Sequence, residues 1–475
     1  MKIPARYAIP ILLIGAGIHA ASAAPGSNVL LVVVDDLNAE LSCYGNPVVK
    51  SPNIDQLAAR GVRFDRAYCQ YPLCNPSRIS FLSGLRPETT GVYVLGTSPR
   101  QAMPDAIMLP QLFRKNGYFS AGAGKVYHSI KTSDRESWDF YQDGEGDDEQ
   151  EKAAIRARYS GGDGSPRSHV LDGDGAKTRD GINARKIAAL LDERAKSGEP
   201  FFLAIGFHKP HLPWTAPRRF FDMYPKGSVP EPESPTMRKV PSVALQTELA
   251  GFAQPESRTG AIAGYYACIS FMDDNLGLVL DRLDSHKLWE RTVVVLVGDN
   301  GFHLGDHGGL WAKHTVFENA TRVPLIIAGA GVPRGKVMPQ PVELLDLYPT
   351  LAELCGLPAP SGLEGKSLVP LMDSGGGLTP SRAFSMVYHY DLTSGTDILG
   401  RSVKTGAFRY TEWANGHHDR ELYLMNQEPD ECDNRAEDPD AIEERTQGER
   451  WLRELKVPKP GPANRPRGLL KEKKR

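Results

Sequence analysis

The sequence has few cysteines, no surplus of charge of either sign, and no long apolar run after its N-terminus. Six cysteines in 475 residues are too few for a fold held together by disulfides. Lysine and arginine number 56 against 58 aspartates and glutamates, which argues against nucleic-acid binding through bulk positive charge. Hydrophobic residues make up 40% and charged residues 24%, which argues against disorder. The length predicts two or three domains, or one large α/β domain with an appendage.

The first 23 residues are typical of a signal peptide. Lys2 and Arg6 precede an apolar run over residues 9–18, and Ala21-Ser22-Ala23 supplies the small residues of a cleavage site. The run is shorter than the ~20 residues of a membrane-spanning helix. We therefore expect cleavage after Ala23, export to a periplasm or the exterior, and no stable membrane insertion. Cleavage removes two positive charges from a net charge of −2, so an anionic substrate must be met by local positive charge.

Apolar runs and helical patterns alternate along the chain. Continuous β-branched runs predict buried strands at 28–34, 201–206 and 292–298, and helical patterns cover 54–60, 109–116, 181–195 and 259–288. This alternation predicts an α/β fold with a mostly parallel central sheet and helices on both faces. Ligands of such sheets bind beyond the carboxyl ends of the strands.

Composition changes suggest how the chain is divided. Residues 143–181 are rich in Gly, Asp, Ser and Arg with little periodicity, and we interpret them as a long surface insertion. The glycines at 375–377 indicate a linker, followed by strand-like segments at 384–390 and 408–413. We therefore expect a catalytic domain over residues 24–375 and a smaller C-terminal α+β subdomain with an antiparallel sheet and a basic tail over residues 376–475.

Cys74 stands in the segment Cys74-Asn75-Pro76-Ser77-Arg78, directly before the expected start of a helix. A helix N-terminus and a nearby guanidinium both favour an anion, so the segment could cradle a nucleophile and an oxyanion substrate. A bare thiol would be a poor nucleophile in an oxidising compartment, because it could oxidise or pair with Cys69. The pairing of the other cysteines is left open by the sequence.

This segment resembles the signature of the formylglycine-dependent sulfatases, matched by Cys74, Pro76, Ser77 and Arg78 and extended by residues 82–86. Further matching blocks lie at 34–36, 124–128, 208–213, 298–301 and 310–313. The resemblance implies an alkaline-phosphatase-like fold and the hydrolysis of sulfate esters. It also implies that a maturation enzyme converts Cys74 to formylglycine, whose hydrated aldehyde is the nucleophile.

Oxygen donors at two strand ends indicate a metal site. Asp35-Asp36 follows the first strand and Asp299-Asn300 follows a similar strand far downstream. Isolated, either pair would be interpreted as turn or helix caps, but together they form a hard-oxygen set that suits Ca²⁺ better than zinc. The resemblance implies that modified Cys74 supplies one more oxygen.

Several cations match the blocks of the family. The resemblance implies that Lys125 and Lys313 bind sulfate oxygens and that Arg78 holds the hydrated formylglycine. It also implies that His128 assists turnover of the covalent intermediate, and that His211 contacts sulfate or protonates the leaving alcohol. His208 and Lys209 could only shape their loop, and Asp306 with His307 could brace Lys313.

Within the family, residues 206–211 and 303–313 are most similar to the iduronate-2-sulfatase branch. This similarity implies a substrate with a 2-O-sulfated uronic acid, in a glycosaminoglycan or another sulfated polysaccharide. Two alternatives remain: a phosphomonoesterase or phosphonate hydrolase of the same superfamily, and a non-catalytic exported carbohydrate-binding protein.

Overall fold

The structure is a computed structural model that describes residues 26–460, except for residues 145, 161–167, 247–254, 375–380, 392–393, 418, 428 and 459. The expected signal peptide lies outside the described residues, as do the expected boundary after residue 375 and nearly all of the basic tail. Within the described ranges, no helix is both long and apolar enough to cross a membrane.

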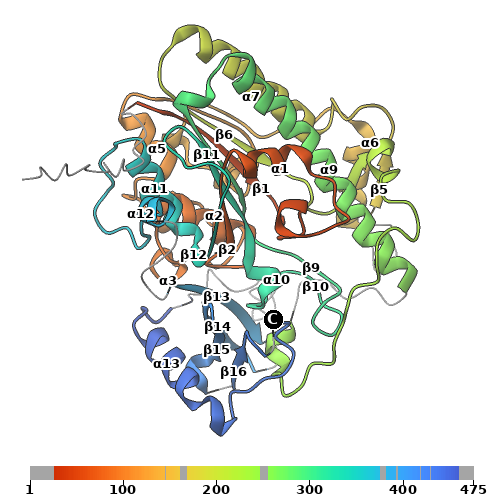
Figure 1. Ribbon diagram of the computed structural model, residues 1–475, viewed down its shortest axis with the longest axis vertical. Helices are drawn as coiled ribbons and strands as arrows, with labels where there is room; N and C mark the ends of the chain where they lie inside the picture. Colours follow the sequence, from red (N-terminus) through yellow and green to blue (C-terminus); the bar gives the residue numbers. More distant parts are fainter. Residues whose placement is uncertain are drawn as a thin grey trace, which may run out of the picture.

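A large mixed sheet forms the centre of the molecule (Figure 1). Its strands run in the order β12-β2-β11-β8-β1-β6-β3-β4. β11 is antiparallel to both of its neighbours, and the other neighbouring pairs are parallel, which confirms the predicted mostly parallel sheet. The strands are β1 (Asn28–Val34), β2 (Gly61–Tyr68), β3 (Phe119–Gly124), β4 (Phe140–Gln142), β6 (Phe201–Phe207), β8 (Thr292–Gly298), β11 (Arg322–Gly329) and β12 (Lys336–Glu343).

The residues of β1 alternate between two hydrophobic cores, one on each face of the sheet. Leu30, Val32 and Val34 share a core with α1 (Pro52–Ala59), α7 (Arg179–Ser197) and α9 (Pro255–Ser285). The intervening residues share the second core with α2 (Cys74–Ser83), α5 (Leu109–Lys115) and α11 (Leu347–Leu354). Every residue of β1 is buried, so the unbroken apolar run reflects a strand without a solvent face. The four predicted helices correspond to α1, α5, α7 and α9.

The segment 143–181, which we interpret as a long surface insertion, contains regular elements among its described residues. It contains α6 (Glu149–Ser160), β5 (Ser168–Leu171) and the beginning of α7, and β5 pairs with β7 (Trp214–Pro217). Few of its described side chains are buried, and one of these is Glu151, which accepts a hydrogen bond from the backbone N–H of Arg179. An element anchored by polar contacts shows little hydrophobic periodicity, which is why the sequence did not predict α6 and β5.

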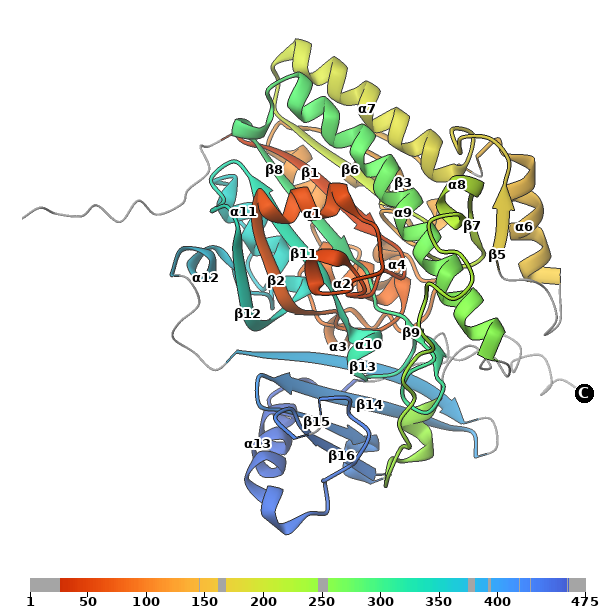
Figure 2. The same ribbon diagram turned by 45° about the vertical axis from the view of Figure 1, so that its right-hand side comes forward.

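A separate antiparallel sheet follows near the C-terminus, and it lies beside the central sheet (Figure 2). Its strands are β13 (Arg382–Asp391), β14 (Thr396–Thr405), β15 (Phe408–Trp413) and β16 (Asp419–Leu424), with α13 (Ile442–Arg453) packed against them through Leu452. The backbone N–H of Met386 donates to the carbonyl of Gln70 at 2.9 Å. The expected C-terminal antiparallel sheet is confirmed, and it contacts the segment that leads to Cys74.

Shorter elements complete the described chain. They are α3 (Pro87–Thr90), α4 (Pro99–Ala102), α8 (Arg218–Phe221), β9 (His303–Leu304), β10 (Trp311–Ala312), α10 (Glu318–Thr321) and α12 (Val369–Ser374). All six cysteines lie in described segments, and all six carry free thiols.

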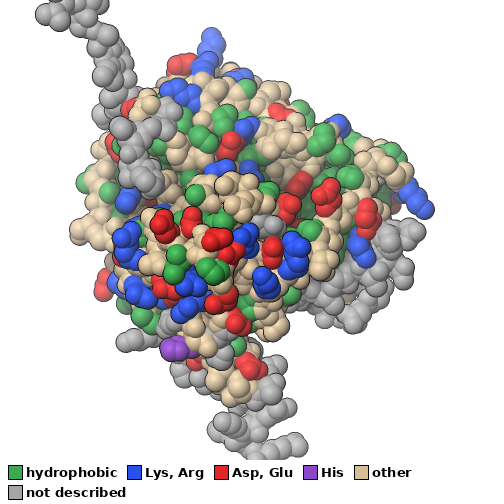
Figure 3. Space-filling view, turned by 60° about the horizontal axis from the view of Figure 1, so that its bottom comes forward, with side chains coloured by type: hydrophobic (Ala, Val, Ile, Leu, Met, Phe, Trp, Pro, Cys, Tyr) green, Lys and Arg blue, Asp and Glu red, His purple; other side chains and the backbone are tan. Residues whose placement is uncertain are grey.

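Basic and acidic side chains are interspersed over the face that Figure 3 shows. This mixture agrees with the balanced totals of the sequence.

Candidate active site

The two polar pairs predicted at strand ends meet at one edge of the central sheet. β1 and β8 are parallel neighbours with Val34 opposite Gly298, so Asp35-Asp36 and Asp299-Asn300 leave the sheet side by side. The backbone N–H of Asp36 donates to Asp299 Oδ1 at 3.0 Å. One carboxylate oxygen from each of Asp35, Asp36 and Asp299 lies within 4.8 Å of the others.

Cys74 is the first residue of α2, as the sequence predicts, and the helix points its N-terminus at the carboxylate cluster. Its Sγ lies 4.0 Å from Asp36 Oδ1. Leu73 before it is extended and supplies no side-chain cap. The N-terminal N–H groups of a helix favour an anion, so the position suits a negatively charged nucleophile or substrate.

Arg78 lies one turn further along α2, and its guanidinium joins two of the acids. Nε donates to Asp299 Oδ2 at 2.8 Å and Nη2 donates to Asp35 Oδ1 at 3.0 Å, with the arginine side chain fully buried. The backbone carbonyl of Val126 accepts a further bond at 3.2 Å. The structure therefore places Arg78 as a brace of the carboxylates, and its predicted contact with formylglycine stays a prediction.

Two lysines flank the Cys74 sulfur. Lys125 directly follows β3, and its Nζ lies 3.9 Å from Sγ and forms an ion pair with Asp35. Lys313 follows the β9-β10 hairpin, and its Nζ lies 3.0 Å from Sγ and forms an ion pair with Asp36. Both lysines are buried. Two ammonium groups beside the nucleophile position can stabilise negative charge on a bound oxyanion.

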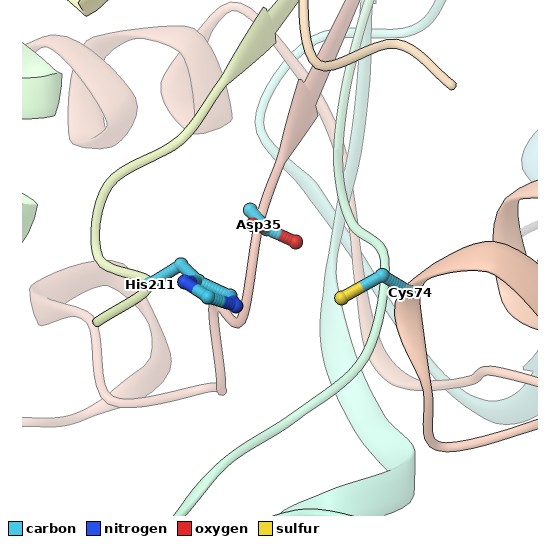
Figure 4. Close-up of side chains that lie close together, drawn as sticks. All are labelled: Asp35, Cys74 and His211. Carbon is cyan, nitrogen blue, oxygen red and sulfur yellow. The ribbon is translucent and has the colours of Figure 1, made fainter. Parts of the chain in front are cut away.

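His211 approaches the same point from the loop after β6. Figure 4 shows Asp35, Cys74 and His211 around a common space, and one ligating atom of each lies within 4.8 Å of the others. His211 Nε2 lies 3.8 Å from Asp36 Oδ2, while Nδ1 lies 2.6 Å from the carbonyl of Leu212. Because a carbonyl only accepts, Nδ1 carries a proton and Nε2 is the nitrogen presented to the site.

His128 lies near Lys125, and its imidazole is uncharged. Burial, and then Lys125, lower the pKa of His128 to about 3. Its imidazole is therefore neutral at physiological pH. Within the described chain, His128 Nδ1 is buried without a hydrogen-bond partner.

The three acids respond differently to their common environment. Burial would raise the pKa of Asp35, but Lys125, His211 and Arg78 outweigh burial and hold it well below its usual range. Burial raises the pKa of Asp36 despite Lys313, and it raises the pKa of Asp299 to about 6 despite Arg78. Carboxylates crowded in this way gain from an additional cation.

The residues at the strand ends fit a divalent cation. Asn300 Oδ1 is buried and has no hydrogen-bond partner among the described residues, while its Nδ2 donates to Asp36 Oδ1 at 2.8 Å. An orphaned amide oxygen beside three carboxylates is a hard-oxygen donor set, which suits calcium or magnesium rather than zinc. The formal charges of the three acids and of Arg78, Lys125 and Lys313 cancel, so a divalent cation would make the cluster attractive to an anion.

Burial also decides the chemistry of Cys74. Burial, and then Asp35, raise the pKa of its thiol, so a thiol at this position is protonated at neutral pH. A protonated thiol is a weak nucleophile. The site therefore suits a modified residue better than an unmodified cysteine.

Four further residues from the sequence analysis contact neighbours in their own loops: His208, Lys209, Asp306 and His307. Lys209 Nζ donates to the carbonyl of Pro213 at 2.7 Å, and His208 Nδ1 lies 3.3 Å from Asp180 Oδ1. Asp306 Oδ1 lies 2.6 Å from His307 Nδ1 and also contacts His303 within the hairpin that precedes Lys313. The contacts of His208 and Lys209 fit the shaping of their loop, and the bracing of Lys313 by Asp306 and His307 stays a prediction.

Sequence analysis missed Asp180, which is buried near the N-terminus of α7. Its carboxylate accepts the backbone N–H groups of His208 at 2.8 Å and of Lys209 at 2.9 Å. Asp180 thereby holds the loop that presents His211. Its only signal in the sequence is a carboxylate in the first turn of a helix, which is common without such a role.

A cavity of about 350 Å³ opens beside the cluster. Its lining includes Lys125, His128 and His211 from the site and Asp143, Glu151 and Arg179 from the segment that was interpreted as an insertion. The space next to the nucleophile position can therefore receive the group that carries a transferred oxyanion.

The fold and the cluster define the class of protein. A large mixed sheet covered by helices, a C-terminal antiparallel sheet and a polar cluster at the strand ends are the features of an alkaline-phosphatase-like fold. The family model described as Sulfatase matches residues 27–357, and one described as N-sulphoglucosamine sulphohydrolase, C-terminal, matches residues 305–457. The chain belongs to the sulfatase family and is a sulfuric ester hydrolase.

Individual proteins similar in sequence are also sulfatases. A sulfatase of Formosa agariphila is 35% identical, with 86% of this chain and 83% of the relative covered. The iduronate 2-sulfatase of Homo sapiens is 32% identical, with 88% and 92% covered. The crystal structure of a phosphonate monoester hydrolase of Agrobacterium radiobacter has the same fold, with a TM-score of 0.73, 22% identity, and 90% and 94% covered.

Proposed function

We propose that this chain is an exported sulfatase that removes the 2-O-sulfate of a uronic acid in fragments of a glycosaminoglycan or another sulfated polysaccharide. The observation that carries the chemistry is the position of Cys74 between Lys125 and Lys313 at the carboxylate cluster. The similarity to an iduronate 2-sulfatase supports the choice of substrate.

We further propose that a maturation enzyme converts Cys74 to formylglycine. The Sγ atom then stands for a hydroxyl oxygen of the hydrated aldehyde, beside Lys313 Nζ at 3.0 Å. The hydrate supplies one hydroxyl that attacks sulfur and a second whose collapse to the aldehyde releases sulfate. The raised pKa of an unmodified thiol at this position supports the proposal.

Asp35, Asp36, Asp299 and Asn300 would hold the calcium ion that the family implies. When bound, calcium supplies positive charge that favours an ionised hydroxyl at residue 74. Arg78 keeps Asp35 and Asp299 in place through its two carboxylate contacts. The orphaned Oδ1 of Asn300 supports this ligand set.

Two lysines and two histidines carry the remaining steps of the proposed reaction. Lys125 and Lys313 neutralise charge on the sulfate oxygens, because both ammonium groups lie beside the nucleophile position in a buried site. His211, as the imidazolium that carries a proton on each ring nitrogen, donates the Nε2 proton to the leaving alcohol and keeps the Nδ1 proton on the Leu212 carbonyl. We assign to His128, whose buried Nδ1 has no hydrogen-bond partner among the described residues, the turnover of the covalent intermediate.

The test is sulfate release from a panel of defined sulfated disaccharides by protein that was matured with a formylglycine-generating enzyme. We expect release from 2-O-sulfated uronic acids and none from disaccharides sulfated only at other positions. Turnover restricted to sulfates of other sugars would contradict the proposed substrate.

The phosphonate monoester hydrolase with the same fold favours one second candidate, a phosphoester or phosphonate hydrolase. Aryl sulfate and aryl phosphonate compared at equal concentration, with and without a chelator, separate the two activities. A higher kcat/KM on the sulfate supports the proposal, and a higher value on the phosphonate supports the second candidate.

Export has a direct test as well. Expression of the full chain in a Gram-negative host, followed by N-terminal sequencing of periplasmic protein, should give Ala24 as the first residue. Uncleaved protein confined to the cytoplasm would contradict this part of the proposal.

A further inference from the structure

The two chain segments that carry the oxygen donors are joined by a tyrosine outside the sequence motifs. Tyr265 lies within α9, and its side chain is fully buried. Its hydroxyl donates to the backbone carbonyl of Asp36 at 2.7 Å and accepts the backbone N–H of Asn38 at 3.0 Å. One side chain thus satisfies two backbone groups of the segment that follows β1.

The backbone of Asp36 needs support of this kind. Its φ of 59° lies in the left-handed region, which residues other than glycine seldom adopt. Aspartate tolerates this conformation better than most residues, but the conformation persists only where neighbouring groups hold it. If the hydroxyl of Tyr265 were lost, the turn could relax and the Asp36 carboxylate would move with it.

The ring of the same tyrosine packs against the segment that follows β8. Tyr265 and Phe302 stack with ring centroids 5.7 Å apart and an interplanar angle of 22°. Phe302 comes two residues after Asn300, and its carbonyl accepts a hydrogen bond from Asn38 Nδ2 at 2.9 Å. Asn38 is buried as well. Tyr265 and Asn38 therefore connect the two ligand segments through groups that are not themselves in the proposed ligand set.

We propose that Tyr265 and Asn38 are positioning residues of the calcium site. They hold the segment of Asp36 against the segment of Asn300, so that the oxygen donors are arranged before the ion binds. This inference rests on the proposed function and its ligand set. Donors that are already ordered lose less conformational freedom when an ion binds, so their affinity for the ion is higher.

The experiment removes one hydroxyl and measures calcium binding directly. Tyr265→Phe retains the ring that stacks on Phe302 and loses both hydrogen bonds of the hydroxyl. Isothermal titration calorimetry of chelator-treated protein with calcium should show a Kd raised by roughly 5- to 20-fold, as expected for lost bonds to buried backbone groups. The calcium concentration for half-maximal sulfate release should rise by a similar factor.

Tyr224→Phe is the matched control. The Tyr224 hydroxyl is also buried, accepts the backbone N–H of Lys50 at 2.8 Å and lies 2.6 Å from Ser270 Oγ, and both partners are outside the two ligand segments. This variant should lower the Tm of calcium-free protein, as Tyr265→Phe should, but it should leave the Kd for calcium within about twofold of wild type. A general loss of stability would affect both variants alike.

Asn38→Ala is a second variant, which removes the bond to Phe302 and leaves the tyrosine intact. It should raise the Kd for calcium by roughly 3- to 10-fold, and it keeps the test decisive if circular dichroism shows that Tyr265→Phe is unfolded. A folded Tyr265→Phe or Asn38→Ala that binds calcium as tightly as wild type would overturn the inference. An equal loss of calcium affinity in Tyr224→Phe would do the same.

Failure of the inference and failure of the proposed function give different results. Wild type that binds calcium and releases sulfate, while Tyr265→Phe binds calcium equally well, overturns the inference alone. Wild type that binds calcium but hydrolyses no sulfate ester overturns the proposed function, and weaker binding by Tyr265→Phe still supports the inference. Wild type that binds no calcium overturns the ligand set and the inference together.

Discussion

At the scale of single residues, Cys74 shows how burial and charge select a chemistry. Its thiol is buried between two ammonium groups and beside carboxylates, and burial followed by Asp35 raises its pKa. The lysines that would stabilise an oxyanion are therefore not sufficient to ionise the thiol. This supports our proposal that a hydrated aldehyde, rather than the thiol, is the nucleophile at this position.

The first prediction concerns this side chain. Cys74→Ala should abolish sulfate release, and Cys74→Ser should lower kcat by roughly three orders of magnitude or more, because the nucleophile is lost. Kinetics with 4-nitrophenyl sulfate measure the effect. Cys43→Ser is the control, since Cys43 is a half-buried cysteine elsewhere and should not matter. A mass spectrum that shows unmodified Cys74 in fully active protein would refute the mechanism.

The second prediction concerns Asn300, whose Oδ1 is buried without a partner among the described residues. Asn300→Ala should raise the calcium concentration for half-maximal activity by roughly tenfold, as expected for one lost oxygen ligand. Titration of chelator-treated enzyme with calcium measures the shift. An unchanged half-maximal concentration would remove Asn300 from the ligand set.

At the scale of elements, the loop after β6 depends on the N-terminus of α7. Asp180 accepts two backbone N–H groups of that loop, and its side chain is buried. The position of His211 is therefore set by a helix that contributes no atom to the reacting centre. The same helix end carries Arg179, so α7 links the catalytic loop to the cavity wall.

The third prediction tests this link. Asp180→Ala should lower kcat by roughly 10- to 100-fold, because the loop would no longer hold His211 in place. A shift of about 1 Å in a catalytic side chain is enough for a loss of this size. The loss should grow with the pKa of the leaving alcohol, if His211 protonates that oxygen as we propose. A series of aryl sulfates of increasing phenol pKa measures the slope, and Asp180→Asn should recover part of it. A loss that is equal for every leaving group would show that Asp180 acts only on stability.

At the scale of the whole molecule, the C-terminal sheet carries a buried acid that couples stability to pH. Trp413 Nε1 and Tyr423 Oη each donate to the Glu421 carboxylate at 2.7 Å. Burial nevertheless raises the pKa of Glu421 from 4.5 to about 7. The folded protein therefore retains a proton over a range in which the unfolded chain has released it.

The fourth prediction follows from the sign of this difference. Below pH 4.5 the carboxyl is protonated in both states, and between pH 4.5 and about 7 only the folded state retains the proton. The free energy of unfolding should fall across that window by roughly 3 kcal/mol from this group. Urea denaturation at several pH values should show a shallower fall for Glu421→Gln than for wild type. Glu443→Gln, on the exposed side of α13, should keep the wild-type dependence.

Much of the fold could be predicted from local patterns. The buried strands β1, β6 and β8 appear as unbroken apolar runs because both of their faces are covered, and α1, α5, α7 and α9 appear through their helical periodicity. The segment 143–181 could not be predicted, because α6 is held by polar contacts such as Glu151 to Arg179 that leave no periodic signal.

The sequence by itself determined which side chains could do the chemistry. Cys74, its neighbours in α2 and the acids after β1 and β8 follow from local motifs, since the type and spacing of residues are properties of the chain. Only the tertiary structure decided how they act together. It placed the guanidinium of Arg78 on two carboxylates and Asp180 beneath the catalytic loop. These contacts join residues far apart in the chain, and their strength depends on burial, which only the packing of the whole molecule creates.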